Sequence, residues 1–586
     1  MTLLASLTKA YERMAERHEV PPFGYSNEKI GFVISLNADG SVANIGDLRR
    51  DEGKKRLAPL MVVPQPVKRT SGVAPNFLWD KSSYVLGVTT GDGKRLADEH
   101  AAFVQLHERV CGNSADPGLN AFLTFLRTWS PAHFADLGWP EEMKDQNIVF
   151  ALENERLDGL YLHDRPEARR LWAALSTSGE RSRAVCLISG EPAAIARLHP
   201  AIKGVWGGQT SGVSLVSYNK EAFESYGHIQ GDNAPISESA AFAYTTVLNT
   251  FLESGSSHRI QLGDASTVFW ADASSAPAAQ LAEDMFQAMF EGIDEGKQAG
   301  AVGALLEQIR QGRPVRDFAP DLGEGVRFHV LGLAPNAARV SIRFWLDDDF
   351  GHLAEHYRQY QTETRIEPPP HDPHPPLWKY LLETAVLGKR ENIPPTLAGD
   401  CMRAILTGNR YPATLLSNVL LRLRSDKEVS ALRVALLKAV LIRNFGHKEA
   451  PVALDPDNTD KGYLLGRLFA LYEQVQTTAL GRNVNATIKD KFYGSASAQP
   501  RKVFHLLDRG SANHLSKIGK QAPGLRISLE RQIGALMEML APSDDPFPAA
   551  LSSQQQALFG LGYYHQRNEF FRPKAKDAAD HKEDTP

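Results

Sequence analysis

A proline-rich segment at residues 367–376 divides the chain into two parts of different character. Six of its ten residues are proline, and proline lacks the amide hydrogen that a helix or a sheet interior needs. We therefore predict an extended linker or a rigid surface loop at 367–376. The preceding residues, 1–366, mix strand-like and helix-like patterns, whereas the residues that follow have apolar side chains at helical spacing almost throughout.

Helical periodicity in the C-terminal part is clearest at 415–424, 431–445, 462–478 and 525–540. An acidic, turn-forming run at 455–460 separates a helical region at 377–454 from a helical bundle at 455–573. Residues 574–586 are rich in charge, and we predict a disordered tail there.

The N-terminal part, residues 1–366, is predicted to contain both kinds of element. The patterns indicate a helix at 1–18, a strand at 32–36 with a hairpin turn at 37–40, mainly helix at 95–180, and strands at 183–188 and 341–346. The predicted fold class is α+β, with a mixed α/β N-terminal region followed by an all-α C-terminal helical bundle.

Length, charge and cysteine content restrict the class of protein. A chain of 586 residues is too long for one core, so several domains are expected. The three cysteines, Cys111, Cys186 and Cys401, are far apart and form no CxxC pair, which fits a reducing compartment without a disulfide framework or a structural zinc site. The N-terminus lacks the pattern of a signal peptide, and no apolar run is long enough to span a bilayer, so we expect a cytoplasmic protein that does not bind membranes.

Positive charge is concentrated in the C-terminal bundle, although the whole chain has a net charge of −4. Residues 461–540 contain twelve Lys or Arg against five acids, a local excess of seven. The preceding helices add Arg422, Arg424, Arg433, Lys438 and Arg443. Such segregation favours a groove that holds a phosphate backbone, and we select Lys489, Lys491, Arg501 and Lys502 as candidate contacts. The alternative is an ordinary solvated helical face.

Two loops in the N-terminal part have the composition of ligand-binding loops. The first, residues 67–80, combines two cations, two hydroxyls and an Asn before an apolar anchor. Its candidate nucleic-acid contacts are Lys68 and Arg69, for phosphates, with Thr70, Ser71 and Asn76, the last facing base edges. The alternative is a structural turn capped by Ser and Thr.

The second loop, residues 206–212, places three glycines and two small hydroxylated residues after a tryptophan. Gly207 and Gly208 would let the backbone approach a narrow groove, where Gln209 or Thr210 could read it or separate a base pair. Asn219 and Lys220 extend the polar surface. The alternative is a Gly-rich transition from strand to loop.

One segment has the pattern of a catalytic metal site. His352-Leu353-Ala354-Glu355-His356 matches the HxxEH pattern of inverted zinc peptidases, in which two His on one helix face share a metal. A zinc-dependent hydrolase is therefore the alternative function. Because nothing in the sequence identifies a third ligand, and no other catalytic constellation emerges, we expect a protein that is not an enzyme and has no metal or cofactor.

Several separate blocks of the sequence resemble one family in the same order. The blocks are Leu3–Leu7 with Tyr11, Pro21–Ser26, Lys68–Gly87, Trp206–Asn219 and His329–Asn336. They resemble the large subunit of type I-C Cascade, the RNA-guided CRISPR surveillance complex, over essentially the whole chain. The resemblance implies recognition of the short motif that flanks the target in duplex DNA and promotion of R-loop formation.

The same resemblance implies a set of partners: CRISPR RNA, double-stranded target DNA and its displaced strand, the backbone and cap subunits of Cascade, and a helicase-nuclease recruited in trans. A small subunit made from an internal start in the same gene is a further possibility, because residues 462–469 resemble the beginning of that unit. No Met stands near 455–460, since Met402 is too early and Met537 too late. Such a product would need a non-Met start codon or a different boundary.

Overall fold

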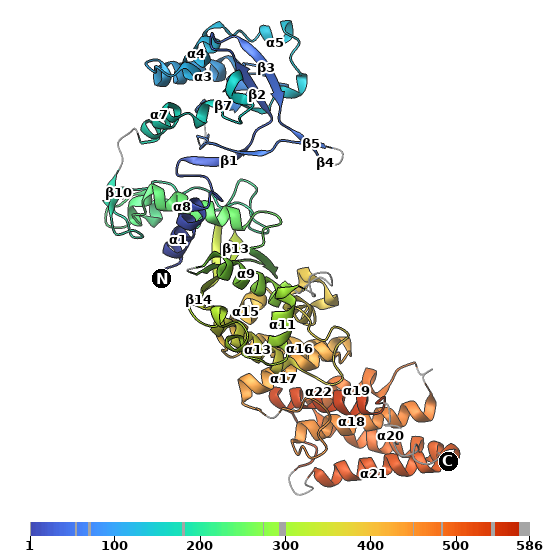
Figure 1. Ribbon diagram of the computed structural model, residues 1–586. Coiled ribbons are helices and arrows are strands. Elements are labelled where there is room, and N and C mark those ends of the chain that lie inside the picture. The colour runs from blue at the N-terminus through green and yellow to red at the C-terminus, as the bar shows by residue number, and fades with distance from the viewer. Residues whose placement is uncertain are drawn as a thin grey trace, which may run out of the picture. The chain divides into compact units, whose positions relative to one another are not determined.

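The computed structural model describes residues 2–52, 55–67, 69, 72–177, 182–273, 275–291, 300–448, 450–481, 485–540 and 545–572 (Figure 1). The predicted tail at 574–586 lies outside these residues. The chain forms two compact units: unit 1 comprises residues 1–200 and 216–250, and unit 2 comprises residues 201–215 and 251–586. With 51% helix and 15% strand, the fold is α+β, as predicted.

Unit 1 is built on a four-stranded sheet in the order β3-β2-β8-β7. Its strands are β2 (Phe32–Leu36), β3 (Val42–Asp47), β7 (Trp79–Lys81) and β8 (Asn147–Leu152). The central strands β2 and β8 run parallel, and both neighbouring pairs are antiparallel. Two helices, α3 (Leu96–Cys111) and α4 (Pro117–Thr128), share a hydrophobic core with this sheet.

The remaining elements of unit 1 are short strands and helices. Two antiparallel ribbons pair β1 with β6 and β4 with β5, and a third pairs β9 with β10. Their bounds are β1 (Tyr25–Lys29), β4 (Arg50–Glu52), β5 (Lys55–Leu57), β6 (Leu60–Pro64), β9 (Arg183–Val185) and β10 (Pro192–Ala194). The helices are α1 (Leu3–Glu16), α2 (Ser82–Val85), α5 (His133–Asp136), α6 (Glu153–Arg156), α7 (Pro166–Thr177) and α8 (Glu238–Phe251).

Unit 2 begins with an antiparallel meander and continues as helices. The sheet follows chain order: β11 (Arg259–Leu262), β12 (Ala265–Asp272), β13 (Arg327–Asn336) and β14 (Arg339–Asp349). The helices that pack around it or follow it are α9 (Ala276–Glu291), α11 (Ala301–Arg310), α12 (Pro320–Gly323), α13 (Phe350–Thr364), α14 (Leu377–Leu382) and α15 (Leu397–Thr407). One hydrophobic cluster extends from Ile260 in this sheet to Tyr564 near the C-terminus.

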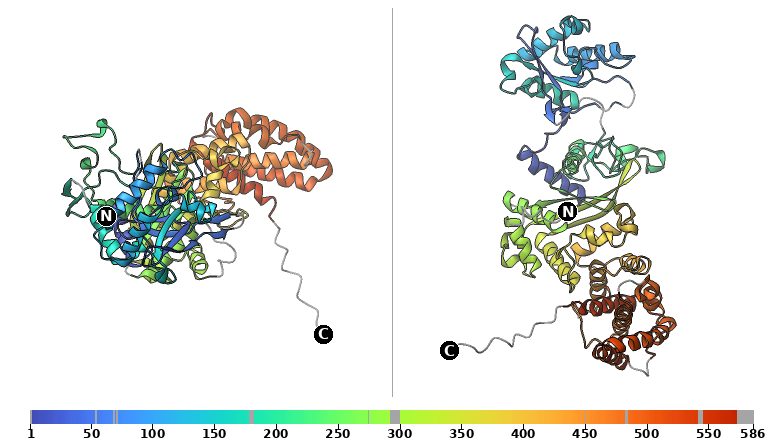
Figure 2. Two further views of the ribbon diagram at one scale, coloured as in Figure 1. Left: turned by 90° about the horizontal axis from the view of Figure 1, so that it is seen from above. Right: turned by 90° about the vertical axis from the view of Figure 1, so that its right-hand side faces the viewer.

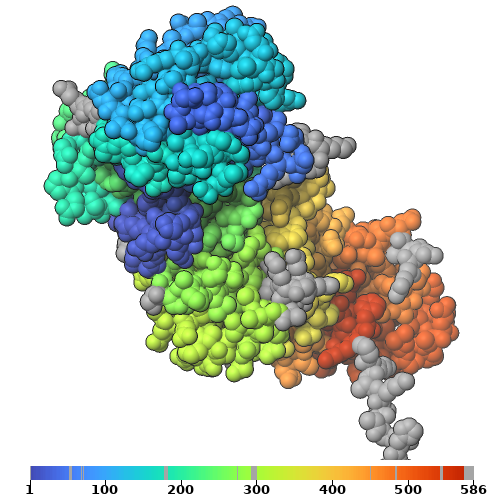
Figure 3. Space-filling model, turned by 45° about the horizontal axis from the view of Figure 1, so that its top comes forward, coloured from blue at the N-terminus to red at the C-terminus, as the bar shows by residue number. Residues whose placement is uncertain are grey.

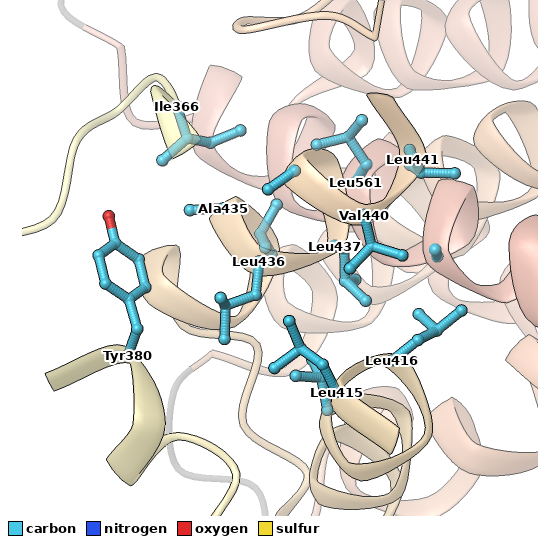
Figure 4. Close-up of a cluster of buried hydrophobic side chains, with 14 of the residues drawn as sticks. Ile366, Tyr380, Leu415, Leu416, Ala435, Leu436, Leu437, Val440, Leu441 and Leu561 are labelled. Carbon is cyan, nitrogen blue, oxygen red and sulfur yellow. The ribbon is translucent and has the colours of Figure 1, made fainter. Parts of the chain in front are cut away.

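The C-terminal helices lie side by side as a bundle, coloured orange to red (Figure 2). They are α16 (Ala413–Asp426), α17 (Ala431–Phe445), α18 (Lys461–Leu480), α19 (Ile488–Ala498), α20 (Pro500–Gln521), α21 (Pro523–Met539) and α22 (Ser553–Glu569). Helix α17 is buried on all sides over residues 433–441, as expected for a helix at the centre of a large core. Figure 4 shows its Leu436, Leu437 and Val440 among side chains of neighbouring helices.

Helices α18 and α22 approach so closely that their backbones touch. A Cβ added at Gly466 would lie 2.1 Å from the carbonyl oxygen of Phe559, and one at Gly562 would lie 2.2 Å from that of Tyr463. Only glycine fits at these positions, because any side chain would push the helices apart. Helix α22 also packs against α17, so it contacts both α17 and α18.

The proline-rich segment 367–376 lies within unit 2 and is bonded to it on two sides. The backbone N–H of Glu367 donates to the Val452 carbonyl at 2.8 Å, and the Tyr564 hydroxyl donates to the Pro368 carbonyl at 2.7 Å. These bonds attach the start of the segment to the helices that follow it.

Most predicted elements are present, with two corrections. The helix at the N-terminus, the β2–β3 hairpin, the strand within β14 and the helices α16, α17, α18 and α21 are confirmed. The region 95–180 contains β8, which was predicted as helix because a continuous apolar run has no periodicity that separates a buried strand from a helix. The strand predicted at 183–188 ends at Val185, because the chain turns at Cys186, whose sulfur accepts the Ile188 N–H at 3.4 Å.

Within the described residues, no helix is both long and apolar enough to cross a membrane.

Candidate nucleic-acid interface

The loop at 67–80 is held by a buried carboxylate on β7. Asp80 is 1% exposed, accepts the Asn76 N–H at 2.8 Å, and forms an ion pair with the guanidinium of Arg69. Arg69 also donates to the Ala74 carbonyl at 2.7 Å and lies over the Tyr84 ring at 4.0 Å. Burial raises the pKa of Asp80, and the neighbouring Arg69 opposes that rise. Arg69 is thus engaged in fixing the loop.

Asn76 has the same internal role. Its side chain is buried, and its Oδ1 accepts the Val67 N–H at 3.0 Å, which closes the base of the loop. Because the amide faces inward, the structure places Asn76 in the framework of the loop instead of at the surface expected of a base contact. Lys68, Thr70 and Ser71 lie outside the described residues.

A buried histidine fixes the end of the loop to α3. The Leu78 N–H donates to Nε2 of His107 at 2.8 Å, and Nδ1 of the same ring donates to the Phe103 carbonyl at 2.8 Å. Burial lowers the pKa of His107 to about 4, so the ring is neutral at pH 7 and can accept the Leu78 hydrogen bond.

A surface pocket of about 580 Å³ adjoins the loop within unit 1. We call it the cation pocket, because Arg69, Lys81, Lys94 and Arg95 line it. Two acids, Glu99 and Asp145, share its wall. Asp145 accepts hydrogen bonds from the Thr89 hydroxyl at 2.7 Å and from the Thr90 side chain, and these bonds hold its pKa below the usual range. The pocket has room for a phosphate group among its cations.

The sequence did not identify this pocket, because its cations come from three separate segments. Residues 91–94, Gly-Asp-Gly-Lys, matched no phosphate-binding motif, and the structure has them in a loop before α3. The sequence feature that could have indicated the cation pocket is the pair Lys94-Arg95, which lies directly before the N-terminus of α3.

The loop at 206–212 belongs to unit 2. A bridge between Ile202 and Val213 closes it, and the Gly212 N–H donates to the Gln209 carbonyl at 2.9 Å. The Trp206 N–H donates to the Ser266 hydroxyl at 3.0 Å, which ties the loop to β12, while the Trp206 side chain is 62% exposed. Gly207 has a φ of 72°, a conformation that favours glycine. Gly208, Gln209 and Thr210 follow it in the same turn, with Thr210 exposed.

Asn219 and Lys220, predicted as an extension of this surface, belong to unit 1. Both are exposed. Lys220 is followed by the exposed carboxylates Glu221 and Glu224, so the surface around it carries no excess of positive charge.

Several exposed cations of the C-terminal bundle lie along one face of α20. Its buried face contains Val503, Phe504 and Leu507, and the opposite face exposes Lys502, Arg509 and Lys520. These three cations are seven and eleven residues apart, close to whole turns of a helix, so they form one line about 27 Å long. Asn513 and Ser516 lie between them. The one acid of α20, Asp508, accepts the Tyr472 hydroxyl at 3.1 Å.

Of the four cations selected from this region, Lys491 and Lys502 are exposed and Lys489 is half-buried. Arg501 is exposed but pairs with Asp545 at 2.7 Å. We call the line of Lys502, Arg509 and Lys520 the α20 stripe; its helix lies in the orange part of the surface in Figure 3.

A family model for the CRISPR-associated protein Cas_Csd1 matches residues 7–571. The chain belongs to this CRISPR-associated family. A search of characterised proteins gave no match.

In this Csd1-family chain, several cations that the sequence assigned to the basic region are internal. Arg433, Lys438 and Arg467 are each less than 10% exposed. Nζ of Lys438 donates to the Thr362 and Glu363 carbonyls at 3.2 and 3.1 Å, at the C-terminus of α13, and burial lowers its pKa to about 8. These side chains stabilise helix packing, so the basic surface is smaller than the sequence count suggested.

The HxxEH-like segment of the Csd1-family chain lies on α13, and its side chains have other partners. Nδ1 of His356 donates to the Leu406 carbonyl at 2.7 Å, and Glu355 pairs with Arg358. His352 is exposed, and a hydrogen bond with Asp348 raises its pKa. The described residues contain no group of three His, Cys, Asp or Glu side chains placed to hold a metal ion.

Proposed function

We propose that the chain is the large subunit of a type I-C Cascade complex in the cytoplasm, and that it recognises the target-flanking motif and promotes R-loop formation. The observation that carries this proposal is the anchored loop at 67–80 beside the cation pocket, in a chain of a CRISPR-associated family. In the proposal, CRISPR RNA, target DNA, the backbone and cap subunits and a recruited helicase-nuclease are its partners, with a small subunit from the same gene as a further one.

The arrangement of the loop supports contact with duplex DNA. The Arg69–Asp80 ion pair and the hydrogen bond from the Val67 N–H to Asn76 fix the described part of the loop on the sheet of unit 1. Lys81, Lys94 and Arg95 add charge beside it. We propose that these cations bind phosphates and position the loop, while its tip reads the groove.

The α20 stripe supports a second, sequence-independent contact. Three cations in one line, with Asn513 and Ser516 between them, match the repeating charge of a nucleic-acid backbone. We propose that the stripe holds the displaced strand, because backbone contacts alone tolerate any sequence. In this proposal the chain acts by binding and leaves catalysis to the recruited nuclease.

The cation pocket can be tested without disturbing the loop. We expect Lys94→Ala/Arg95→Ala in the assembled complex to weaken binding of target duplex and to reduce the slope of log K against log salt by about two, one for each cation–phosphate pair that the variant removes. Filter binding at several salt concentrations measures both quantities. Arg69→Ala is a poor test, since it would leave Asp80 buried without its partner.

Arg127→Ala/Arg170→Ala is the matched control for the pocket variant. It also removes two exposed cations from unit 1, but neither lines the pocket. Equal losses of affinity in the two double variants would show that general charge matters and the pocket does not.

The α20 stripe has its own prediction. We expect Lys502→Glu/Arg509→Glu/Lys520→Glu to leave guide loading intact and to reduce the salt slope for R-loop formation by about two, since single-stranded contacts release about 0.7 counterion each. Reversal of three exposed cations elsewhere in unit 2, Arg316, Lys389 and Arg403, serves as the control. An unchanged slope in the stripe variant would remove the stripe from the proposal.

A further inference from the structure

A tight hairpin at Ser225–His228 presents a tyrosine at its tip. Tyr226 and Gly227 are the two central residues, with φ of 54° and 78°, and the His228 N–H donates to the Ser225 carbonyl at 2.9 Å. Two-residue turns with positive φ at both positions favour Asn-Gly, because a larger side chain at the first position is strained. A tyrosine at this position opposes the local backbone preference.

The side chain of Asn233 holds the hairpin in place by hydrogen bonds. Oδ1 of Asn233 accepts the Ser225 N–H at 3.0 Å, and its Nδ2 donates to the His228 and Gln230 carbonyls, both at 3.0 Å. Asn233 therefore ties both arms of the turn to the short helix Gln230–Asn233. The tip is a defined structure, so the position of Tyr226 is fixed by the fold.

The ring of Tyr226 contributes nothing to that fold. Its side chain is 100% exposed, and the apolar Ile229, three residues later, is 59% exposed. Within the described part of the chain, the Tyr226 ring has no stacking, cation–π or hydrogen-bond partner. A strained backbone that displays an aromatic side chain to solvent is the arrangement expected of a binding anchor.

The charge near the tip indicates the kind of partner. The exposed stretch 219–229 contains two carboxylates, Glu221 and Glu224, against the single cation Lys220. A phosphate backbone would be repelled by these carboxylates, whereas Lys or Arg side chains would pair with them and could also lie over the tyrosine ring. Tyrosine and isoleucine beside carboxylates thus match a protein surface that combines an apolar pocket with cations.

We propose that the Tyr226 hairpin is a docking anchor for another protein subunit of the ribonucleoprotein complex, with Tyr226 and Ile229 entering an apolar pocket and Glu221 and Glu224 pairing with cations at its rim. This inference rests on the proposed function, since the partner is a subunit of that complex. It adds a specific contact surface, distinct from the loop at 67–80 and the α20 stripe.

The turn itself offers a sharp test. Tyr226→Asn removes the ring and restores the residue that the turn prefers, so the variant chain should be at least as stable as the wild type. We expect its retention with the co-expressed backbone and cap subunits and CRISPR RNA, measured by affinity purification without target DNA, to fall at least tenfold. Tyr226→Phe should retain wild-type assembly, and Glu221→Lys/Glu224→Lys should lose it. Leu157→Asn, which changes another exposed apolar residue of unit 1, is the control.

Each other outcome contradicts the inference in a different way. Normal assembly of Tyr226→Asn with weakened target binding would assign the tip to nucleic acid instead of protein. Normal assembly and normal target binding would show that the tip has no docking role, while the proposed function would stand. Failure of the wild-type chain to enter the particle would reject the proposed function, and the docking anchor with it.

Discussion

Gly466→Ala is expected to destabilise unit 2 by about 3 kcal/mol or more. A Cβ at this position would lie 2.1 Å from the Phe559 carbonyl oxygen and 2.8 Å from the Tyr563 nitrogen. Both atoms belong to the backbone of α22, so no side-chain rotation relieves the clash, and α18 and α22 must separate along their whole contact. Urea unfolding followed by far-ultraviolet circular dichroism measures the loss, because most of the helical residues belong to unit 2.

The control is the same substitution on a neighbouring helix. Gly510 is exposed on α20 and has no atom within 4 Å of an added Cβ. Gly510→Ala should therefore raise helix stability by up to about 1 kcal/mol, the difference in helix propensity. A similar loss of stability in both variants would mean that close contact between α18 and α22 is not what requires glycine at 466.

Arg443→Met is expected to destabilise unit 2 by about 3–5 kcal/mol, the usual consequence of leaving a buried charge without its partner. Arg443 on α17 and Glu363 on α13 form an ion pair at 2.7 Å, with side chains only 4% and 3% exposed. Tyr411 donates to the same carboxylate at 2.9 Å, and Arg443 also donates to the Ala404 carbonyl at 2.7 Å. The pair therefore joins α13, α15 and the loop that contains Tyr411 to α17.

A double variant distinguishes the buried charge from lost packing. Arg443→Met/Glu363→Gln removes both charges while the glutamine carbonyl can still accept the Tyr411 hydroxyl. We expect it to recover at least half of the stability that Arg443→Met loses, as measured by thermal unfolding at pH 7. If the double variant were as unstable as the single one, the loss would come from the missing arginine interactions instead of the unpaired carboxylate.

The sequence predicted the fold class and many elements, because their signals are local. The β2–β3 hairpin has Asp39-Gly40 between two strand-like runs, and α18 is a largely apolar segment too long for a strand and free of proline. Strand β8 was missed because burial on both faces removes the alternation that identifies a strand.

Which cations are accessible could not be predicted. Helix α17 is buried on all sides over residues 433–441, so no apolar stripe in its sequence separates an inward face from the positions of Arg433 and Lys438. Arg69 and Asn76 look like free polar side chains in the sequence, because their partners become apparent only in the folded loop. Arg69 pairs with Asp80, which is buried once β7 joins the sheet, and the Asn76 side chain accepts the Val67 N–H. The cations of the pocket come from three separate segments. A local sequence pattern does not show that these segments lie close together in the fold.

The order of helices along the chain affects how unit 2 folds during synthesis. Helix α22 covers α17 and α18, but the ribosome synthesises it after both of them. The apolar faces of α17 and α18 that pack against α22 therefore stay uncovered until α22 has been made. A premature stop codon before residue 553 would leave every proposed binding residue intact. The truncated chain would nevertheless expose apolar surface, and it would depend on chaperones or aggregate.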